Sequence, residues 1–160
     1  MKGTLTPAGL LRRLLDADQD RTTVSLGLLL LRVAVGALIF YVHGWHKLAG
    51  GWQHVAHGAP WPLLEEVAAM GTPLPLAAAF AATLVQFLAA PLLAIGLCTR
   101  VNAALLTAVL LGAVAQNLQS ARDPQLAVLY TLAVAAFMLI GGGRYSWDAR
   151  LSRRITPAHA

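Results

Sequence analysis

The 160-residue chain is 58% hydrophobic and only 12% charged, whereas soluble domains carry about 25% charged residues. This composition excludes an ordinary soluble domain and indicates an integral membrane protein. The net charge is +5, but the basic residues form no stripe and no nucleic-acid-binding motif, so we expect no nucleic-acid partner. Cys98 is the only cysteine, which excludes an intramolecular disulfide and a CxxC redox centre.

Residues 1–23 predict a cytoplasmic N-terminal segment with a short helix on the membrane surface. Thr6 and Pro7 can cap and begin this helix. Its leucines gather on the face opposite Arg12 and Arg13, as in interfacial helices. The alternative is a basic tail that only sets the topology.

The run from Val24 to Leu48, VSLGLLLLRVAVGALIFYVHGWHKL, predicts the first membrane-spanning helix. It begins with about twenty nearly uncharged apolar residues, enough to cross the roughly 30 Å hydrocarbon core. Arg32 interrupts it and shares one helical stripe with Gly36, Ile39 and His43. This stripe must face protein or water, and Gly36 leaves room for a neighbouring helix.

Residues 44–73 predict a structured loop on the outer side, with three tryptophans that suit the headgroup layer. Within it, Pro62 to Met70 predicts a short helix that Gly71 and Pro73 end.

Three further apolar segments follow, at about Leu74–Leu97, Val101–Leu118 and Gln125–Gly141. With the first helix they predict an all-α fold, an antiparallel four-helix transmembrane bundle over residues 24–141. Residues 142–160 are expected to form a cytoplasmic basic C-terminal tail.

The basic residues outside the membrane predict the orientation. Nine lie on one side, and only Lys47 and Arg122 on the other. The positive-inside rule places both termini in the cytoplasm, so we expect a multi-pass protein of the bacterial inner membrane with the lipid bilayer as its environment. The nine residues are Lys2, Arg12, Arg13, Arg21, Arg100, Arg144, Arg150, Arg153 and Arg154.

Three motifs resemble those of the DoxX family, small four-helix membrane proteins of bacteria and archaea. They are LLLLRVAVGALIFYVHGWHKL, LLAIGLCTR and GGGRYSWDARL, which appear in the family's order over about residues 25–151. The resemblance implies a subunit associated with a quinone-linked or other membrane oxidoreductase system, such as thiosulfate:quinone oxidoreductase. This association makes quinone the candidate cofactor, and we expect no covalently bound cofactor. In the resemblance, many relatives carry a glutamate in the second apolar segment where this chain has Gln86. An amide can neither exchange protons near neutral pH nor neutralise the charge of Arg32.

Arg32 and Gln86 form the first candidate site. They lie about 12 and 16 Å from the cytoplasmic ends of their predicted helices, which are compatible depths. Two interpretations stay open. Arg32 is held by Gln86 and the Phe87 carbonyl for packing, or it binds an anionic or carbonyl-bearing ligand.

Four histidines form the second candidate site, with the spacing H-x2-H-x7-H-x2-H. Such a set can ligate zinc or copper, but the spacing matches no strong metal signature and no cysteine joins it. We therefore expect no bound metal. The histidines are His43, His46, His54 and His57.

The third candidate site is a cluster at the outer leaflet made by Tyr41, His43, Gln116 and Tyr130. These side chains come from the first predicted helix and from the segments at about Val101–Leu118 and Gln125–Gly141, at similar predicted depths. Aromatic walls with a few hydrogen-bond donors suit a quinone headgroup, and we expect a cavity with Tyr41 directed inward. The alternative is an ordinary interfacial belt.

These features leave the activity open between classes. The leading hypothesis is a subunit of, or accessory to, a quinone-linked oxidoreductase system, which would supply protein partners. The alternatives are a carrier or binding protein for an anionic metabolite at Arg32, and a scaffold without a small-molecule site. No nucleophile–base pair or phosphate loop is recognisable, which disfavours an autonomous enzyme.

Overall fold

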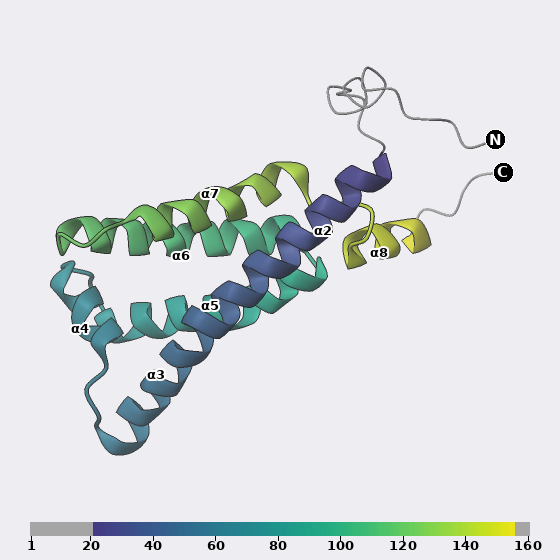
Figure 1. The fold of residues 1–160 in the computed structure, drawn as a ribbon. Helices are drawn as coiled ribbons and strands as arrows, with labels where there is room; N and C mark the ends of the chain where they lie inside the picture. The colour runs from purple at the N-terminus through teal and green to yellow at the C-terminus, as the bar shows by residue number, and fades with distance from the viewer. Residues whose placement is uncertain (1–20, 156–160) are drawn as a thin grey trace, which may run out of the picture.

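A computed structural model describes residues 21–155, so the surface helix expected near the N-terminus lies outside the described residues. The described part of the chain is helical throughout and contains no strand, which confirms the all-α class (Figure 1). Its elements are α2 (Arg21–Leu38), the π-helix η1 (Ile39–Gly44), α3 (Trp45–His57), α4 (Pro62–Ala69), α5 (Pro75–Ile95), α6 (Thr99–Gln119), α7 (Gln125–Ile140) and α8 (Trp147–Ile155).

The first helix is longer than the sequence predicted. The segments α2, η1 and α3 form one continuous helix over Thr22–His57, 36 residues and therefore about 54 Å long. The polar stretch His43 to Lys47 near the end of the predicted helix does not end it, because it contains no proline and Gly44 keeps helical dihedral angles. Gly58 ends it instead, with a left-handed φ of 64° and an N–H that donates to the His54 carbonyl at 2.9 Å. Much of the expected outer loop is consequently helical.

Helices α5, α6 and α7 lie side by side and are joined by short turns (Figure 1). Their bounds agree with the three predicted apolar segments to within about two residues. Within the described residues, the helices long and apolar enough to cross a membrane are Thr22–His57, Pro75–Ile95 and Thr99–Gln119. The chain is a membrane protein by these three spans. Helix α7 is also apolar but has 16 residues, so the fourth crossing stays a prediction.

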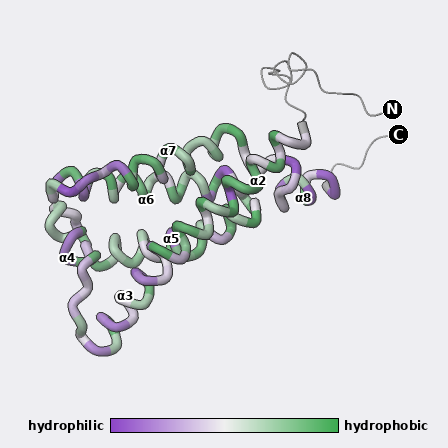
Figure 2. The backbone as a smooth tube through the Cα atoms, in the orientation of Figure 1, coloured by the Kyte–Doolittle hydropathy of each residue, from purple (hydrophilic) through white to green (hydrophobic). Residues whose placement is uncertain are grey.

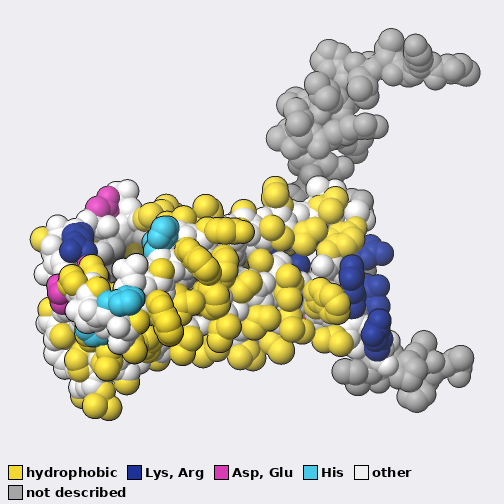
Figure 3. Space-filling model, turned by 90° about the horizontal axis from the view of Figure 1, so that it is seen from below, with side chains coloured by type: hydrophobic (Ala, Val, Ile, Leu, Met, Phe, Trp, Pro, Cys, Tyr) yellow, Lys and Arg dark blue, Asp and Glu magenta, His cyan; other side chains and the backbone are white. Residues whose placement is uncertain are grey.

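The main core lies where the long first helix packs on α5 and where α6 packs on both α5 and α7. Leu93 and Leu106 are fully buried there. A second, smaller core lies under α4, where Trp61 packs against Ala79 and Phe80. Hydrophobic residues predominate along the helices (Figure 2). Apolar side chains cover much of the outer surface between the two ends (Figure 3). Such a surface is suited to contact with lipid rather than water.

The first helix and α5 approach closely at two glycines. A Cβ on Gly36 would lie 2.7 Å from the Ala90 carbonyl oxygen and 2.8 Å from the Ala94 Cβ. A Cβ on Gly44, at the end of η1, would lie 3.3 Å from the Gln86 carbonyl oxygen. The close approach expected at Gly36 is confirmed, and Gly44 extends it.

The expected C-terminal tail contains structure that the sequence analysis missed. After a turn with left-handed glycines at 141 and 143, the chain forms α8 beside the turn between α5 and α6 (Figure 1). We call this end of the molecule, which exposes Arg100, Arg144, Arg150, Arg153 and Arg154, the basic end.

Candidate functional site

Arg32 is buried at the basic end, with 1% of its surface exposed. Its Nε donates a hydrogen bond to the Ala94 carbonyl at 3.1 Å. Its terminal nitrogens donate to the carbonyls of Gly142 and, at 3.5 Å, Tyr145. The guanidinium therefore ties α2 to α5 and to the segment that follows α7.

Gly96 makes room for this guanidinium. It ends α5 with a φ of 77°, and a Cβ there would lie 2.6 Å from Arg32 Nη1. Both the left-handed backbone and the missing side chain favour glycine at this position.

Asp148, on α8, completes the arrangement. Its carboxylate accepts hydrogen bonds from the N–H groups of Cys98 at 2.7 Å and Thr99 at 2.8 Å. It thereby caps the start of α6, as a side chain at the helix N-cap would. Burial raises the pKa of Asp148. The Thr99 hydroxyl, the two N–H groups and the Arg32 charge together lower it by more than burial raises it, so the pKa lies below the usual 3.8.

These contacts join the three sequence motifs that resemble the DoxX family. We call the set Arg32, Gly96, Gly142, Tyr145 and Asp148 the Arg32 network. Its hydrogen bonds show that Arg32 is held by main-chain carbonyls of other residues, so the interpretation in which Gln86 and the Phe87 carbonyl hold Arg32 is wrong. The predicted depths failed because the helices are not flush: Arg32 lies level with Ala94, more than two turns along α5 from Gln86.

A polar cavity of about 270 Å³ lies at the opposite end, among η1, α3, α4, α5, α6 and α7. Apolar residues such as Leu110 and Leu126 line part of it. Its polar lining residues are His43, Lys47, Glu66, Gln86, Gln116, Asn117, Arg122, Asp123 and Tyr130.

Gln86 is the most deeply buried polar group in this lining, with 1% of its surface exposed. Among residues 21–155 nothing donates a hydrogen bond to its Oε1. A buried polar atom without a partner is costly and rare in folded proteins. The His43 ring lies edge-on to the Tyr130 ring in the same cavity, with centroids 5.8 Å apart.

An ion pair lies at the edge of the polar cavity. Arg122 Nη1 is 2.7 Å from Glu66 Oε1 and links α4 to the turn between α6 and α7. The sequence analysis did not identify Glu66, Arg122 or Asp123 as site residues and used Arg122 only for the topology. The signal available was that these charges flank the apolar helices in the two connections predicted on the outer side.

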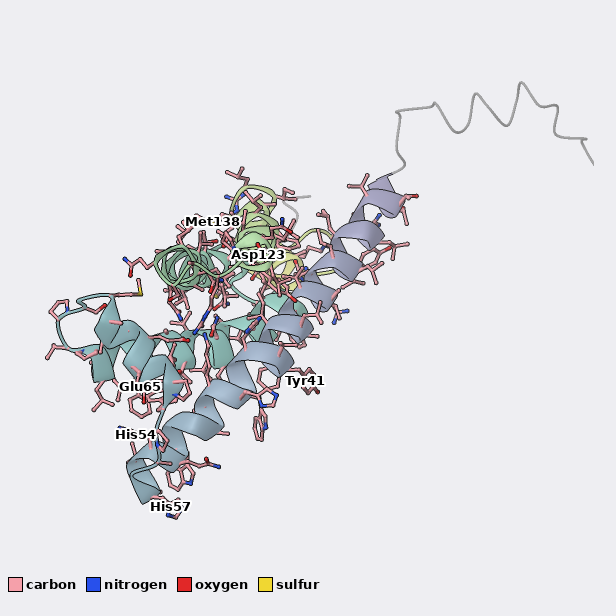
Figure 4. All side chains as sticks on the ribbon, turned by 60° about the vertical axis from the view of Figure 1, so that its left-hand side comes forward. Tyr41, His54, His57, Glu65, Asp123 and Met138 are labelled. Carbon is pink, nitrogen blue, oxygen red and sulfur yellow. The ribbon has the colours of Figure 1, made fainter. Side chains whose placement is uncertain are left out.

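The cavity brings together four of the six candidate ligand-binding residues, His43, Gln86, Gln116 and Tyr130. Tyr41 is not among them. Its surface is 68% exposed, and it points away from the helix bundle (Figure 4). The expectation that Tyr41 faces inward is therefore wrong. Tyr41 lies two residues after the buried Ile39, which places it on the opposite face of the same helix.

The four histidines do not converge. Only His43 lines the cavity, while His46 and His57 are exposed. The His54 Nδ1 pairs with the Ala59 carbonyl oxygen at 2.7 Å. Over the described range 21–155, no three His, Cys, Asp or Glu side chains lie close enough to hold a metal ion.

Comparison with known proteins gives one match. Neither the curated proteins nor the solved structures contain a match to this chain. The model of the DoxX family matches residues 27–117, more than half of the chain, and this range includes Arg32, Gln86 and Gln116. The chain therefore belongs to the DoxX family.

Proposed function

We propose that this DoxX protein is a subunit of, or accessory to, a quinone-linked oxidoreductase system in the bacterial inner membrane, and that its polar cavity receives the quinone headgroup. The observation that carries the proposal is the buried, unpaired Gln86 in a cavity that also holds His43, Gln116 and Tyr130.

The chemistry of the lining supports a carbonyl-bearing ring. The Tyr130 hydroxyl and the amide N–H groups of Gln86 and Gln116 can donate hydrogen bonds to the carbonyl oxygens of a quinone, and Gln86 Oε1 can accept one from a hydroxyl of the reduced quinol. The apolar Leu110 and Leu126 supply contact area. A volume of about 270 Å³ lies at the small end of ligand sites and suits a headgroup, with the isoprenoid tail left in the lipid.

We further propose an antiparallel four-helix transmembrane bundle with the basic end in the cytoplasm. The exposed arginines at that end support this orientation by the positive-inside rule (Figure 3). Helix α7 packs along α6, and its 16 residues extend about 24 Å, close to the thickness of the hydrocarbon core. The polar cavity then lies in the outer half of the bilayer.

A second candidate is a carrier or binding protein for a small polar metabolite. The charged side chains of Lys47, Glu66, Arg122 and Asp123 around the cavity favour it. Arg32 does not support this function, since its nitrogens are engaged by main-chain carbonyls. The third hypothesis, a scaffold, requires that the cavity bind nothing.

The decisive experiment measures binding of a quinone analogue to the purified full-length protein in nanodiscs. Tyr130→Phe removes a donor in the cavity, and Tyr41→Phe is the matched control because Tyr41 lies outside it. Loss of one neutral hydrogen bond corresponds to about two- to tenfold weaker binding. We expect this loss for Tyr130→Phe and none for Tyr41→Phe.

Three results separate the hypotheses. Quinone that co-purifies with the protein supports the proposal. Uptake of a polar metabolite into proteoliposomes, without quinone binding, supports the second candidate. Absence of both, or equal affinities for wild type and Tyr130→Phe, contradicts the quinone site.

A further inference from the structure

Helix α8 is fixed firmly to the basic end of the molecule. Its first turn is capped by Ser146, whose Oγ accepts a hydrogen bond from the Ala149 N–H at 3.1 Å. The Asp148 N–H donates to the Gly96 carbonyl at 2.9 Å, and the Asp148 carboxylate caps α6. The direction of α8 is therefore set by the membrane-spanning helices and not by a loose tail.

The exposed side of α8 combines apolar and basic side chains. Trp147 and Leu151 are one turn apart and both are exposed. Arg150 and Arg154 form a second row beside them, and the Arg150 guanidinium carbon lies 5.7 Å from the centre of the Trp147 ring. This arrangement is typical of helices that lie in a membrane interface, with the ring in the acyl boundary and the guanidinium groups at the phosphates.

Among residues 21–155, no acidic side chain forms an ion pair with the exposed arginines at this end. Arg144, Arg150, Arg153 and Arg154 are exposed, and in the part of the chain that the structure describes, the one ion pair is between Arg122 and Glu66 at the other end. Asp148, the acidic residue on α8, is already bonded to the start of α6. Figure 3 shows the larger gathering of basic groups at one end, and the histidines and carboxylates at the other end together with a smaller basic group.

The position of α8 brings its exposed arginines to the level of the lipid headgroups. The α5–α6 turn and the end of α7 lie beside α8 (Figure 1), so α8 lies where two candidate spans leave the bilayer. We propose that α8 is a membrane-surface helix that binds the acidic phospholipid headgroups of the leaflet at the basic end. Arg150, Arg153 and Arg154 bind the phosphodiester groups, and Trp147 and Leu151 insert between the lipids.

The test is native mass spectrometry of the full-length protein, titrated in detergent with phosphatidylglycerol or with phosphatidylcholine. We expect wild type to bind phosphatidylglycerol at least about tenfold more tightly. Each arginine near a charged surface contributes about fivefold, so the triple variant R150Q/R153Q/R154Q should lose about a hundredfold in affinity for phosphatidylglycerol alone. The control R150K/R153K/R154K keeps the charge and should keep most of the affinity.

Several outcomes overturn the proposal. These are equal binding of the two lipids by wild type, phosphatidylglycerol binding by the Gln variant at wild-type strength, and complete displacement of the lipid by equimolar inorganic phosphate, which would indicate a site for free anions. If the Gln variant does not fold, the salt dependence of wild type decides. Raising the salt concentration from about 0.05 to about 0.5 M should weaken the lipid complex at least tenfold, because the exposed charges are screened. An affinity that does not change with salt would contradict the proposal.

Discussion

Arg32 on α2 donates a hydrogen bond to the main-chain carbonyl of Gly142, 110 residues further along the chain. This contact closes the basic end of the molecule, because it joins the first helix to the segment after the last apolar helix. It also explains how a guanidinium is tolerated in an apolar run. The charge lies beside the helix ends and is surrounded by carbonyl dipoles, which lowers the cost of burying it.

Replacing Arg32 should damage the fold more than any surface arginine. Arg32→Leu leaves the carbonyls of Ala94, Gly142 and Tyr145 without their donor, and each buried unpaired group costs about 1–3 kcal/mol. Arg122→Leu breaks an ion pair in which the arginine side chain is 59% exposed, which contributes about 0–1 kcal/mol. Thermal unfolding in detergent compares the two. Equal melting temperatures would show that the Arg32 network contributes nothing to stability.

Asp148 should make the stability of the fold decrease at acidic pH. Its pKa in the folded protein lies below the usual 3.8, so the ionised carboxylate stabilises the fold above about pH 4, and this contribution is lost as the pH falls through the folded pKa. Asp148→Ala removes the cap of α6 at a cost of about 0.5–2 kcal/mol near neutral pH. Melting temperatures between about pH 7 and pH 3 should converge for wild type and Asp148→Ala as the pH falls. Curves that stay parallel over this range would contradict the assignment.

Gly36 and Gly27 offer a matched pair on one helix. A Cβ on Gly36 would clash with Ala90 and Ala94, whereas a Cβ on Gly27 meets nothing within 4 Å. Gly36→Ala should therefore destabilise by about 1–3 kcal/mol through overpacking. Gly27→Ala should be neutral or stabilise by up to about 1 kcal/mol through helix propensity. Chemical unfolding in mixed micelles measures both, and a stable Gly36→Ala protein would refute the close crossing of α2 and α5.

Helix period and helix length predicted much of this fold. Apolar runs bounded by glycine and proline gave α5, α6 and α7 nearly as the structure has them. The interior stripe of Arg32, Gly36 and Ile39 is confirmed by their burial, because the period of an α-helix determines which side chains share a face.

The predictions that were wrong concerned side chains whose positions depend on tertiary contacts. Depth along a helix does not indicate which face a side chain occupies, so Tyr41 was wrongly grouped with Tyr130. Comparing depths also assumes that the cytoplasmic ends of the two helices lie at the same level. They do not, so Arg32 was wrongly paired with Gln86. The partners of Arg32 are main-chain carbonyls, and every residue carries one, so no side-chain pattern could identify them.

The proposed orientation can be tested with single cysteines in a Cys98→Ser background. Gln53 on α3 and Ser152 on α8 are both exposed, at opposite ends of the fold. With the basic end in the cytoplasm, a membrane-impermeant maleimide added to intact spheroplasts should label Gln53→Cys and not Ser152→Cys. Permeabilised cells provide the control in which both are labelled. Labelling of Ser152→Cys alone in intact spheroplasts would reverse the topology.

Gln86 allows a stability test and a binding test of the same residue. Its Oε1 is buried without a hydrogen-bond partner among the described residues, so the folded protein carries a cost that a donor on the ligand, such as a hydroxyl of the reduced quinol, would remove. An apolar side chain of similar size removes the cost without the ligand. A residue retained for packing and a residue retained for binding therefore respond differently to Gln86→Leu.

We predict that Gln86→Leu keeps or raises the melting temperature and weakens binding of the quinone analogue by about tenfold, the trade-off expected where a site costs stability. Thr83→Val is the matched control one turn earlier on α5. Its buried hydroxyl donates to the Ala79 carbonyl at 2.8 Å and does not line the polar cavity. That variant should lose about 1 kcal/mol of stability and bind the analogue as wild type does. If Gln86→Leu instead destabilises the protein and binds normally, Gln86 serves packing and the polar cavity is not the ligand site.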